Sequence, residues 1–318
     1  MSQNHLVTID HIRAAARRIA NYVHRTPVLS SQLINAEAGC NISFKCENLQ
    51  KVGAFKARGA HNAVLCLSST QLAQGVATHS SGNHAAALAL AASHFGVPAY
   101  IVMPENAPVA KVAAVRAYGG DIIFCESTQA ARESALAALC ERTGASFIPP
   151  YDHPDVIAGQ GTAALELAEQ LKPAPDFLLT PVGGGGLLAG CAVASKTAMP
   201  KTLVIGAEPA GADDAFHSFK TGKLQAQLAP DTVADGLRTG LGTINFQLIR
   251  EHVDDILTAN DSAIIHATRL VWTRMKLVIE PSAALGLAVV LSHPQRFANK
   301  RVAVVFSGGN VDIDRLPW

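Results

Sequence analysis

Short apolar segments alternate along the chain with longer segments in which apolar residues recur every three or four positions. The short segments are typical of buried strands and the longer ones of helices. The first helix is expected to begin after Thr8, a capping residue, and to place Ile12 and Ile19 on one face. Farther along, we predict strands at 76–78, 99–103 and 121–124 and helices at 85–95, 107–118 and 128–142. This alternation predicts right-handed βαβ units and a parallel sheet.

A proline-rich segment at 149–154 interrupts the alternation and indicates a crossover. The rest of the chain contains predicted helices at 156–171, 187–197, 261–276 and 281–291 and strands at 42–47, 177–180, 203–207 and 302–306. We interpret residues 209–242, rich in glycine and charged residues, as irregular. The whole pattern predicts an α/β protein with a small domain at 73–149 and a large domain formed by 1–72 and 150–318. A ligand cleft is expected at the carboxyl ends of the strands.

The composition fits this fold class and excludes several functions. Hydrophobic residues make up 49% of the 318 residues and charged residues 16%, so alanine-rich helices can cover buried strands on both sides. The net charge of +1 gives no basis for binding nucleic acid or an anionic membrane. Six cysteines without C-x-x-C spacing, no signal-peptide pattern and no apolar run of roughly 20 residues predict a soluble, cytoplasmic protein.

Lys56 is the first candidate for chemistry. It lies beside Phe55 in the segment KVGAFKARGA at 51–60, where a basic turn leads into a helical pattern. Burial against an aromatic ring lowers the pKa of a lysine, and a neutral amine can form a Schiff base with a carbonyl compound. The alternative is a solvated lysine on a helix surface, which is the more common situation.

Three turns follow predicted strands, where open α/β sheets bind ligands. Four consecutive glycines at 183–186 precede a helix, so their N–H groups can converge on a phosphate; a merely flexible turn would carry a large entropic cost. The Walker lysine is absent, so the phosphate need not belong to a nucleotide. The turn SSGNH at 80–84 precedes a predicted helix, and it either binds a carboxylate or only caps the start of that helix. Ser307, in SGGN, contacts a heterocyclic nitrogen or belongs to an ordinary turn.

Three acidic residues suggest a cation site. Glu208, Asp213 and Asp214 follow the predicted strand at 203–207. Hard oxygen ligands close in sequence suit Mg²⁺ or Ca²⁺. An acidic loop in solvent has the same pattern and is the alternative.

Five motifs extend over almost the whole chain: GAFKARGA at 53–60, HSSGNH at 79–84, VIAGQGT at 156–162, the glycine turn and SGGN at 307–310. In these motifs the chain resembles fold type II pyridoxal-phosphate enzymes, which have two tryptophan synthase β-like domains, and within them the serine/threonine dehydratase and serine racemase family. Its segments AEP at 207–209, ADD at 212–214 and MKLVIEP at 275–281 are most similar to the serine racemase-like and 3-hydroxyaspartate dehydratase branch. The resemblance implies a homodimer whose small domain closes over an amino-acid substrate.

The resemblance also implies the members of each site, with Lys56 and Ser81 as the catalytic residues. The cofactor, pyridoxal 5′-phosphate, would be held by Phe55, Lys56, Asn83, Gly183, Gly184, Gly185, Gly186, Leu187, Glu280 and Ser307. The substrate would be bound by Ser80, Ser81, Asn83 and His84. A divalent cation (Mg²⁺, or else Mn²⁺ or Ca²⁺) would be bound by Glu208, Asp214 and the carbonyl of Ala212.

The implied reaction removes water from a 3-hydroxy amino acid (3-hydroxyaspartate, L-serine or L-threonine) and gives a 2-oxo acid and ammonia. Lys56 would form the Schiff base and later take the α-proton, and the cofactor phosphate would protonate the departing hydroxyl. Ser307, unlike a carboxylate, would leave the ring nitrogen largely neutral, which favours elimination. If Arg132 faces the cleft, its guanidinium can bind a second carboxylate, which would favour 3-hydroxyaspartate.

Three alternatives remain open. Ser81 matches the racemase residue that serves the opposite face of the substrate, so the first is an amino-acid racemase with dehydratase side activity. The second is a nucleotide-binding oxidoreductase that uses the glycine turn, and the third a protein that carries the cofactor without catalysis. Ala54 replaces the usual serine before the Phe-Lys pair, and Ala86 stands where ATP-binding racemases commonly have glutamine. The alanine at position 86 argues against activation by ATP.

Overall fold

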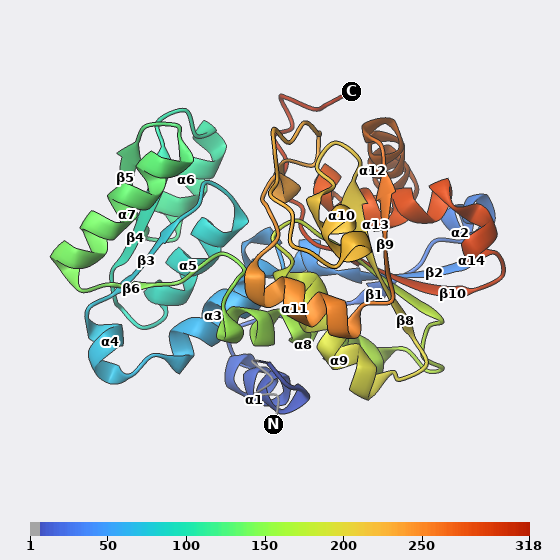
Figure 1. Ribbon diagram of the computed structural model, residues 1–318, viewed down its shortest axis with the longest axis horizontal. Helices are drawn as coiled ribbons and strands as arrows, with labels where there is room; N and C mark the ends of the chain where they lie inside the picture. Colours follow the sequence, from blue (N-terminus) through green and yellow to red (C-terminus); the bar gives the residue numbers. More distant parts are fainter. Residues whose placement is uncertain (1–6) are drawn as a thin grey trace.

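The computed structural model describes residues 7–318, which fold around two separate sheets (Figure 1). Residues 1–6 of the expected large domain lie outside the described part. The larger sheet consists of β1 (Val28–Leu29), β2 (Asn41–Cys46), β10 (Arg301–Phe306), β7 (Phe177–Pro181), β8 (Leu203–Pro209) and β9 (Asp255–Ala259), in that spatial order. The smaller sheet consists of β5 (Asp121–Cys125), β4 (Ala99–Pro104), β3 (Val76–His79) and β6 (Ser146–Phe147). Among these strands, β1 alone runs antiparallel to its neighbour.

Helices surround both sheets. They are α1 (Ile9–Ile19), α2 (Gln32–Ala38), α3 (Lys56–Cys66), α4 (Ser69–Ala73), α5 (Asn83–Ser93), α6 (Val109–Ala117), α7 (Gln129–Thr143), α8 (Pro154–Gln170), α9 (Gly186–Ala198), α10 (Asp214–Thr221), α11 (Thr243–His252), α12 (Asp261–Met275), α13 (Pro281–Ser292) and α14 (Pro294–Phe297). Three short 3₁₀ turns are η1 (Glu47–Leu49), η2 (Lys51–Gly53) and η3 (Asp235–Leu237). Within residues 7–318, no helix has the length and apolar character that crossing a membrane requires.

Both faces of each sheet are covered, which explains the consecutive apolar residues in the strands. On β10, Val304 packs in the cluster formed with α2, α12 and α13, while its neighbour Val305 packs in the cluster with α1, α8 and α9. In the smaller sheet, Ile101 packs with α5 and Val102 packs with α7. A strand buried on both sides needs apolar residues at every position. The predicted parallel α/β fold is therefore confirmed.

The predicted strands and helices are present, with ends shifted by one or two residues. The interpretation of 209–242 as irregular is wrong in part, because α10 lies within it. The start of α10 is capped from the preceding strand: the Glu208 carboxylate accepts the backbone N–H groups of Ala215 and Phe216 at 2.9 and 2.6 Å. A cap from so far back in the chain leaves no local signal of the Ser-x-x-Glu kind.

A buried group of charged residues fixes α3, the helix that begins at Lys56. The Arg58 side chain has no exposed area and donates to both oxygens of Glu47 at 2.7 and 2.8 Å. It also donates to both oxygens of Glu166, on α8, at 2.7 and 2.9 Å. The Nζ of Lys45, on β2, lies 2.6 Å from the same Glu166. Two positive and two negative side chains thus satisfy one another, which is the condition for burying ionised groups.

Candidate active site

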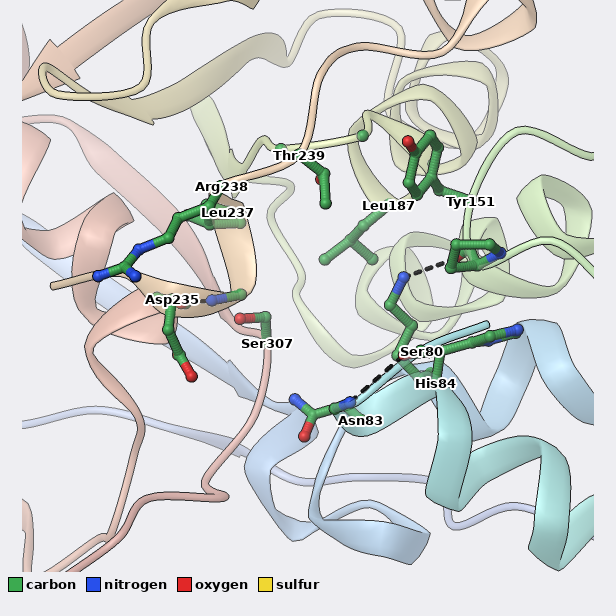
Figure 2. Close-up of a pocket in the computed structure, with 18 of the residues that line it drawn as sticks. Ser80, Asn83, His84, Tyr151, Leu187, Asp235, Leu237, Arg238, Thr239 and Ser307 are labelled. Atoms are coloured by element: carbon green, nitrogen blue, oxygen red, sulfur yellow. Dashed lines mark hydrogen bonds between the residues drawn. The ribbon is translucent and has the colours of Figure 1, made fainter. Parts of the chain in front are cut away.

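Segments that follow β3, β7 and β10 line one cavity of about 620 Å³, together with parts of α3, α8 and the residues around η3 (Figure 2). Its lining includes all the residues predicted to bind the cofactor or the substrate, namely Phe55, Lys56, Ser80, Ser81, Asn83, His84, Arg132, Gly183, Gly184, Gly185, Gly186, Leu187, Glu280 and Ser307. The two sheets contribute from opposite sides. The fold therefore brings together residues that lie far apart in the sequence.

Lys56 is the first residue of α3, and its amine is enclosed by its neighbours. Its Nζ donates to the carbonyl of Pro150 at 2.5 Å and lies 5.1 and 6.0 Å from the ring centres of Phe55 and Tyr151. Burial lowers the pKa of Lys56 to about 8, although the negative charge of Glu280 acts in the opposite direction. Near pH 8 a substantial share of the Lys56 amine is therefore neutral, and the neutral form is the one that acts as a nucleophile or a base.

Backbone hydrogen bonds join the lysine turn to the turn after the last strand. The N–H of Phe55 donates to the carbonyl of Ser307 at 2.9 Å, and the N–H of Gly309 donates to the carbonyl of Gly53 at 2.9 Å. Ser307 itself is only 3% exposed. The two turns form one rigid wall, so Ser307 is held in the same cavity as Lys56.

The glycine turn opposite this wall fits a phosphate group. Helix α9 begins there without a side-chain cap, and Gly185 has a φ of +93°, which residues with a side chain rarely adopt. A Cβ on Gly184 would lie 2.3 Å from the Tyr151 ring. The amide of Asn245 donates to the carbonyl of Gly184 at 2.7 Å and fixes the turn. The N–H groups of an uncapped helix start are suited to binding an anion.

Asn83 connects the smaller sheet to the far side of the cavity. Its Nδ2 donates to the two oxygens of Glu280 at 3.1 and 3.2 Å, and its Oδ1 accepts from Asn310 at 2.9 Å. Burial, followed by the nearby charge of Asp235, raises the pKa of Glu280 to about 7. Glu280 is therefore partly protonated at neutral pH.

The protonation state of His84 follows from its surroundings. Its side chain is buried, and its Nε2 lies 3.0 Å from the carbonyl oxygen of Ile148, which can only accept. Nε2 therefore carries the proton, and Nδ1, which has no hydrogen-bond partner in the described part of the chain, presents a lone pair. Burial, with the charge of Lys56, lowers the pKa of His84 to about 3 and keeps the ring neutral.

The lining also contains polar side chains that the sequence analysis did not single out, among them Tyr151, Lys111, Asp235 and Arg238. Tyr151 contacts the glycine turn and flanks the Lys56 amine, and its place in the proline-rich crossover was the available signal (Figure 2). Lys111 lies on α6, and Asp235 and Arg238 lie in the region interpreted as irregular. No local pattern distinguishes these three from solvated surface residues.

The predicted cation ligands lie outside the cavity lining. Glu208 and Asp214 are buried, and burial raises the pKa of Glu208 to about 9 and also raises that of Asp214. The Oδ1 of Asp214 has no hydrogen-bond partner among the described residues. Within residues 7–318, no group of three His, Cys, Asp or Glu side chains could hold a metal, so carbonyls such as that of Ala212 and water would complete the coordination. Both oxygens of Glu208 and the Oδ2 of Asp214 accept backbone N–H groups, so the Oδ1 of Asp214 is the oxygen of this pair left for a further partner within residues 7–318.

Comparison with known proteins identifies the class of enzyme. Residues 19–308 match the family model described as pyridoxal-phosphate dependent enzyme. The chain is 48% identical to a β-hydroxyaspartate dehydratase of Paracoccus denitrificans, over 99% of both chains. It is 47% identical to an L-threo-3-hydroxyaspartate ammonia-lyase of Saccharomyces cerevisiae, over 97% of this chain and 94% of that protein. The solved structure of serine racemase from Dictyostelium discoideum, 45% identical, matches with a TM-score of 0.92 over 97% of this chain and 100% of that one.

The chain therefore belongs to the pyridoxal-phosphate-dependent enzymes and has fold type II. Within that family it stands beside hydroxy-amino-acid dehydratases, ammonia-lyases and serine racemases. The family resemblance predicted from the motifs is confirmed. The nucleotide-binding oxidoreductase is thereby set aside.

The pKa of Lys56 predicts how the apoenzyme takes up its cofactor. Only the neutral amine reacts with an aldehyde, so the rate of covalent attachment should rise with pH and level off above about 8. An unperturbed lysine would continue to rise toward about 10.4. Rapid-mixing absorbance of apoenzyme with pyridoxal phosphate measures the rate, and Lys56→Ala should show no covalent attachment. A wild-type rate that still climbs steadily above about pH 9 would contradict the lowered pKa.

Proposed function

We propose that this enzyme removes water from a 3-hydroxy amino acid, with 3-hydroxyaspartate as its preferred substrate, and releases a 2-oxo acid and ammonia. The observation that carries the proposal is the single cavity that holds Lys56, the glycine turn and Ser307. The names of the relatives from Paracoccus denitrificans and Saccharomyces cerevisiae support the substrate class.

The residues of the cavity suggest a division of tasks. Lys56 would bind the cofactor covalently, the glycine turn and Leu187 would bind its phosphate, and Asn83 and Ser307 would contact its ring. When bound, the cofactor withdraws electrons from Cα of the amino acid. Lys56, with a pKa of about 8, is suited to accepting the α-proton near neutral pH. A hydroxyl at Ser307 would not fix a proton on the ring nitrogen as a carboxylate would.

The turn before α5 would bind the substrate α-carboxylate. Ser80 and Ser81 offer hydroxyl donors, and α5 begins without a side-chain cap, so its first N–H groups face an anion favourably. His84 would act differently from its neighbours, because the lone pair on its Nδ1 repels a carboxylate. We assign it the task of accepting a hydrogen bond and thereby orienting a hydroxyl group.

A racemase is the second candidate, and Ser81 is the observation that favours it. Ser81 lines the same cavity as Lys56, and its hydroxyl would serve as the second proton-transfer group. Incubation in deuterium oxide separates the two reactions. Deuterium at an inverted Cα of an amino acid that keeps its hydroxyl indicates racemisation, whereas loss of the hydroxyl indicates elimination.

The substrate proposal is tested by measuring kcat/KM for 2-oxo acid formation from each 3-hydroxyaspartate stereoisomer, L-serine and L-threonine. We expect 3-hydroxyaspartate to be the best substrate. Arg132→Ala should reduce its kcat/KM by roughly ten- to a hundredfold relative to serine, because a charge-assisted hydrogen bond is lost. Arg142→Ala, an exposed arginine at the other end of α7, is the matched control and should leave the ratio unchanged. Equal losses on both substrates in Arg132→Ala would contradict the assignment.

The cation site is proposed at Glu208, Asp214 and the carbonyl of Ala212, for Mg²⁺ or another hard divalent ion. A bound cation would stabilise the folded state, so a chelator should lower the melting temperature and added Mg²⁺ should restore it. The double variant Glu208→Gln/Asp214→Asn should not respond to the chelator. A wild-type melting temperature that is insensitive to both additions would refute the site.

Three further properties belong to the same proposal. Residues 73–149 would form the small domain, which closes over substrate; X-ray scattering with and without substrate would detect this. The enzyme would be a homodimer, which sedimentation can check. A cytoplasmic location, testable by cell fractionation, is consistent with six cysteines that form no disulfide.

A further inference from the structure

An ion pair bridges the cavity between the two sheets. Lys111 lies on α6, beside the smaller sheet, and Asp235 lies in η3, on the side of the larger sheet. The Lys111 Nζ and the Asp235 Oδ2 are 2.6 Å apart, and both residues line the cavity. Their side chains are 30% and 46% exposed, so the pair lies where the cavity meets solvent.

The other positively charged side chains of the described cavity lining donate hydrogen bonds to backbone carbonyls and not to a carboxylate. Among the described residues, the lysines and arginines of the lining are Lys56, Lys111, Arg132 and Arg238. Arg238 donates to the carbonyl of Thr232 through Nε at 3.0 Å, and Arg132 and Lys56 likewise donate to backbone carbonyls. Lys111 is the one member of this set with a hydrogen bond to a carboxylate.

Asp235 would otherwise disfavour an anionic substrate. It lies close enough to Glu280 that its charge raises the pKa of that carboxyl, and Lys111 acts in the opposite direction. These two carboxylates are the acidic side chains of the described cavity lining. Lys111 is paired with Asp235 and its charge also acts on Glu280, so it places a positive charge beside both carboxylates at the solvent-facing edge of the cavity.

We propose that Lys111 and Asp235 form an exchangeable gate, in which the second carboxylate of the incoming substrate replaces Asp235 as the partner of Lys111. This inference rests on the proposed substrate class and adds a specificity-determining pair to it. With the substrate bound, Lys111 makes the same charge-assisted contact that it makes to Asp235, so the smaller sheet stays tied to the opposite wall. A monocarboxylate such as serine cannot complete the exchange.

The gate predicts effects of opposite sign for its two members. Lys111→Met should raise the dissociation constant for 3-hydroxyaspartate roughly two- to fivefold, the scale of a partly exposed pair, and that for serine less. Asp235→Asn should lower the dissociation constant for 3-hydroxyaspartate, because Lys111 loses a competitor. The double variant should return toward the wild-type value. A purely structural ion pair predicts the same direction for both single variants, since either substitution breaks the same contact.

Titration of the holoenzyme with each amino acid, followed by the absorbance of the bound cofactor, gives these constants without relying on turnover. Lys196→Met is the matched control, because Lys196 and Asp254 form a 2.7 Å pair of similar exposure outside the cavity lining. Shifts in the same direction for both gate variants, or no shift in either, would overturn the gate. Opposite shifts without any 2-oxo acid product would support the gate and refute the proposed reaction. Melting temperatures of all variants, with Lys111→Gln as a second substitution, separate binding effects from loss of folding.

Discussion

The arrangement of the site depends on the ion pairs of the Arg58 guanidinium, which lies buried two residues after Lys56. The guanidinium bonds Glu47, which follows β2, and Glu166, on α8, so the first turn of α3 is fixed from two directions. Loss of one partner would leave an uncompensated buried charge, which costs about 3–5 kcal/mol in comparable networks. Because α3 also packs against α5, the same contact sets the position of the smaller sheet relative to the larger one.

Burial is the common cause of the unusual protonation states in the cavity. It lowers the pKa of Lys56 to about 8 and that of His84 to about 3, and it raises that of Glu280 to about 7. Burial weakens the two bases, Lys56 and His84, and the acid, Glu280, for the same reason: the charged form of each group loses its hydration. The result is a cavity in which a lysine and a carboxyl both exchange protons near neutral pH, which suits a reaction that begins with proton removal from carbon.

The parts of the fold that the sequence predicted are those with a local cause. Strands such as β10 show uninterrupted apolar runs because both of their faces are buried, and the glycine turn carries its conformational requirement in its composition. The lowered pKa of Lys56 became apparent only in the structure, because it results from burial of the amine, which distant residues such as Pro150 and Tyr151 surround. Helix α10 was not predictable because Glu208, which caps it, belongs to the preceding strand and matches no local capping motif. The Lys111–Asp235 pair was not predictable because it joins segments that lie far apart in the sequence.

The central claim is that Lys56 is the residue that carries the cofactor. Reduction of the holoenzyme with borohydride, followed by proteolysis and peptide mass analysis, fixes the cofactor on the lysine that holds it. The account predicts a pyridoxyl group on the peptide that contains Lys56 and on no other lysine. A label on Lys51 or Lys111, or an unlabelled enzyme after reduction, would contradict it.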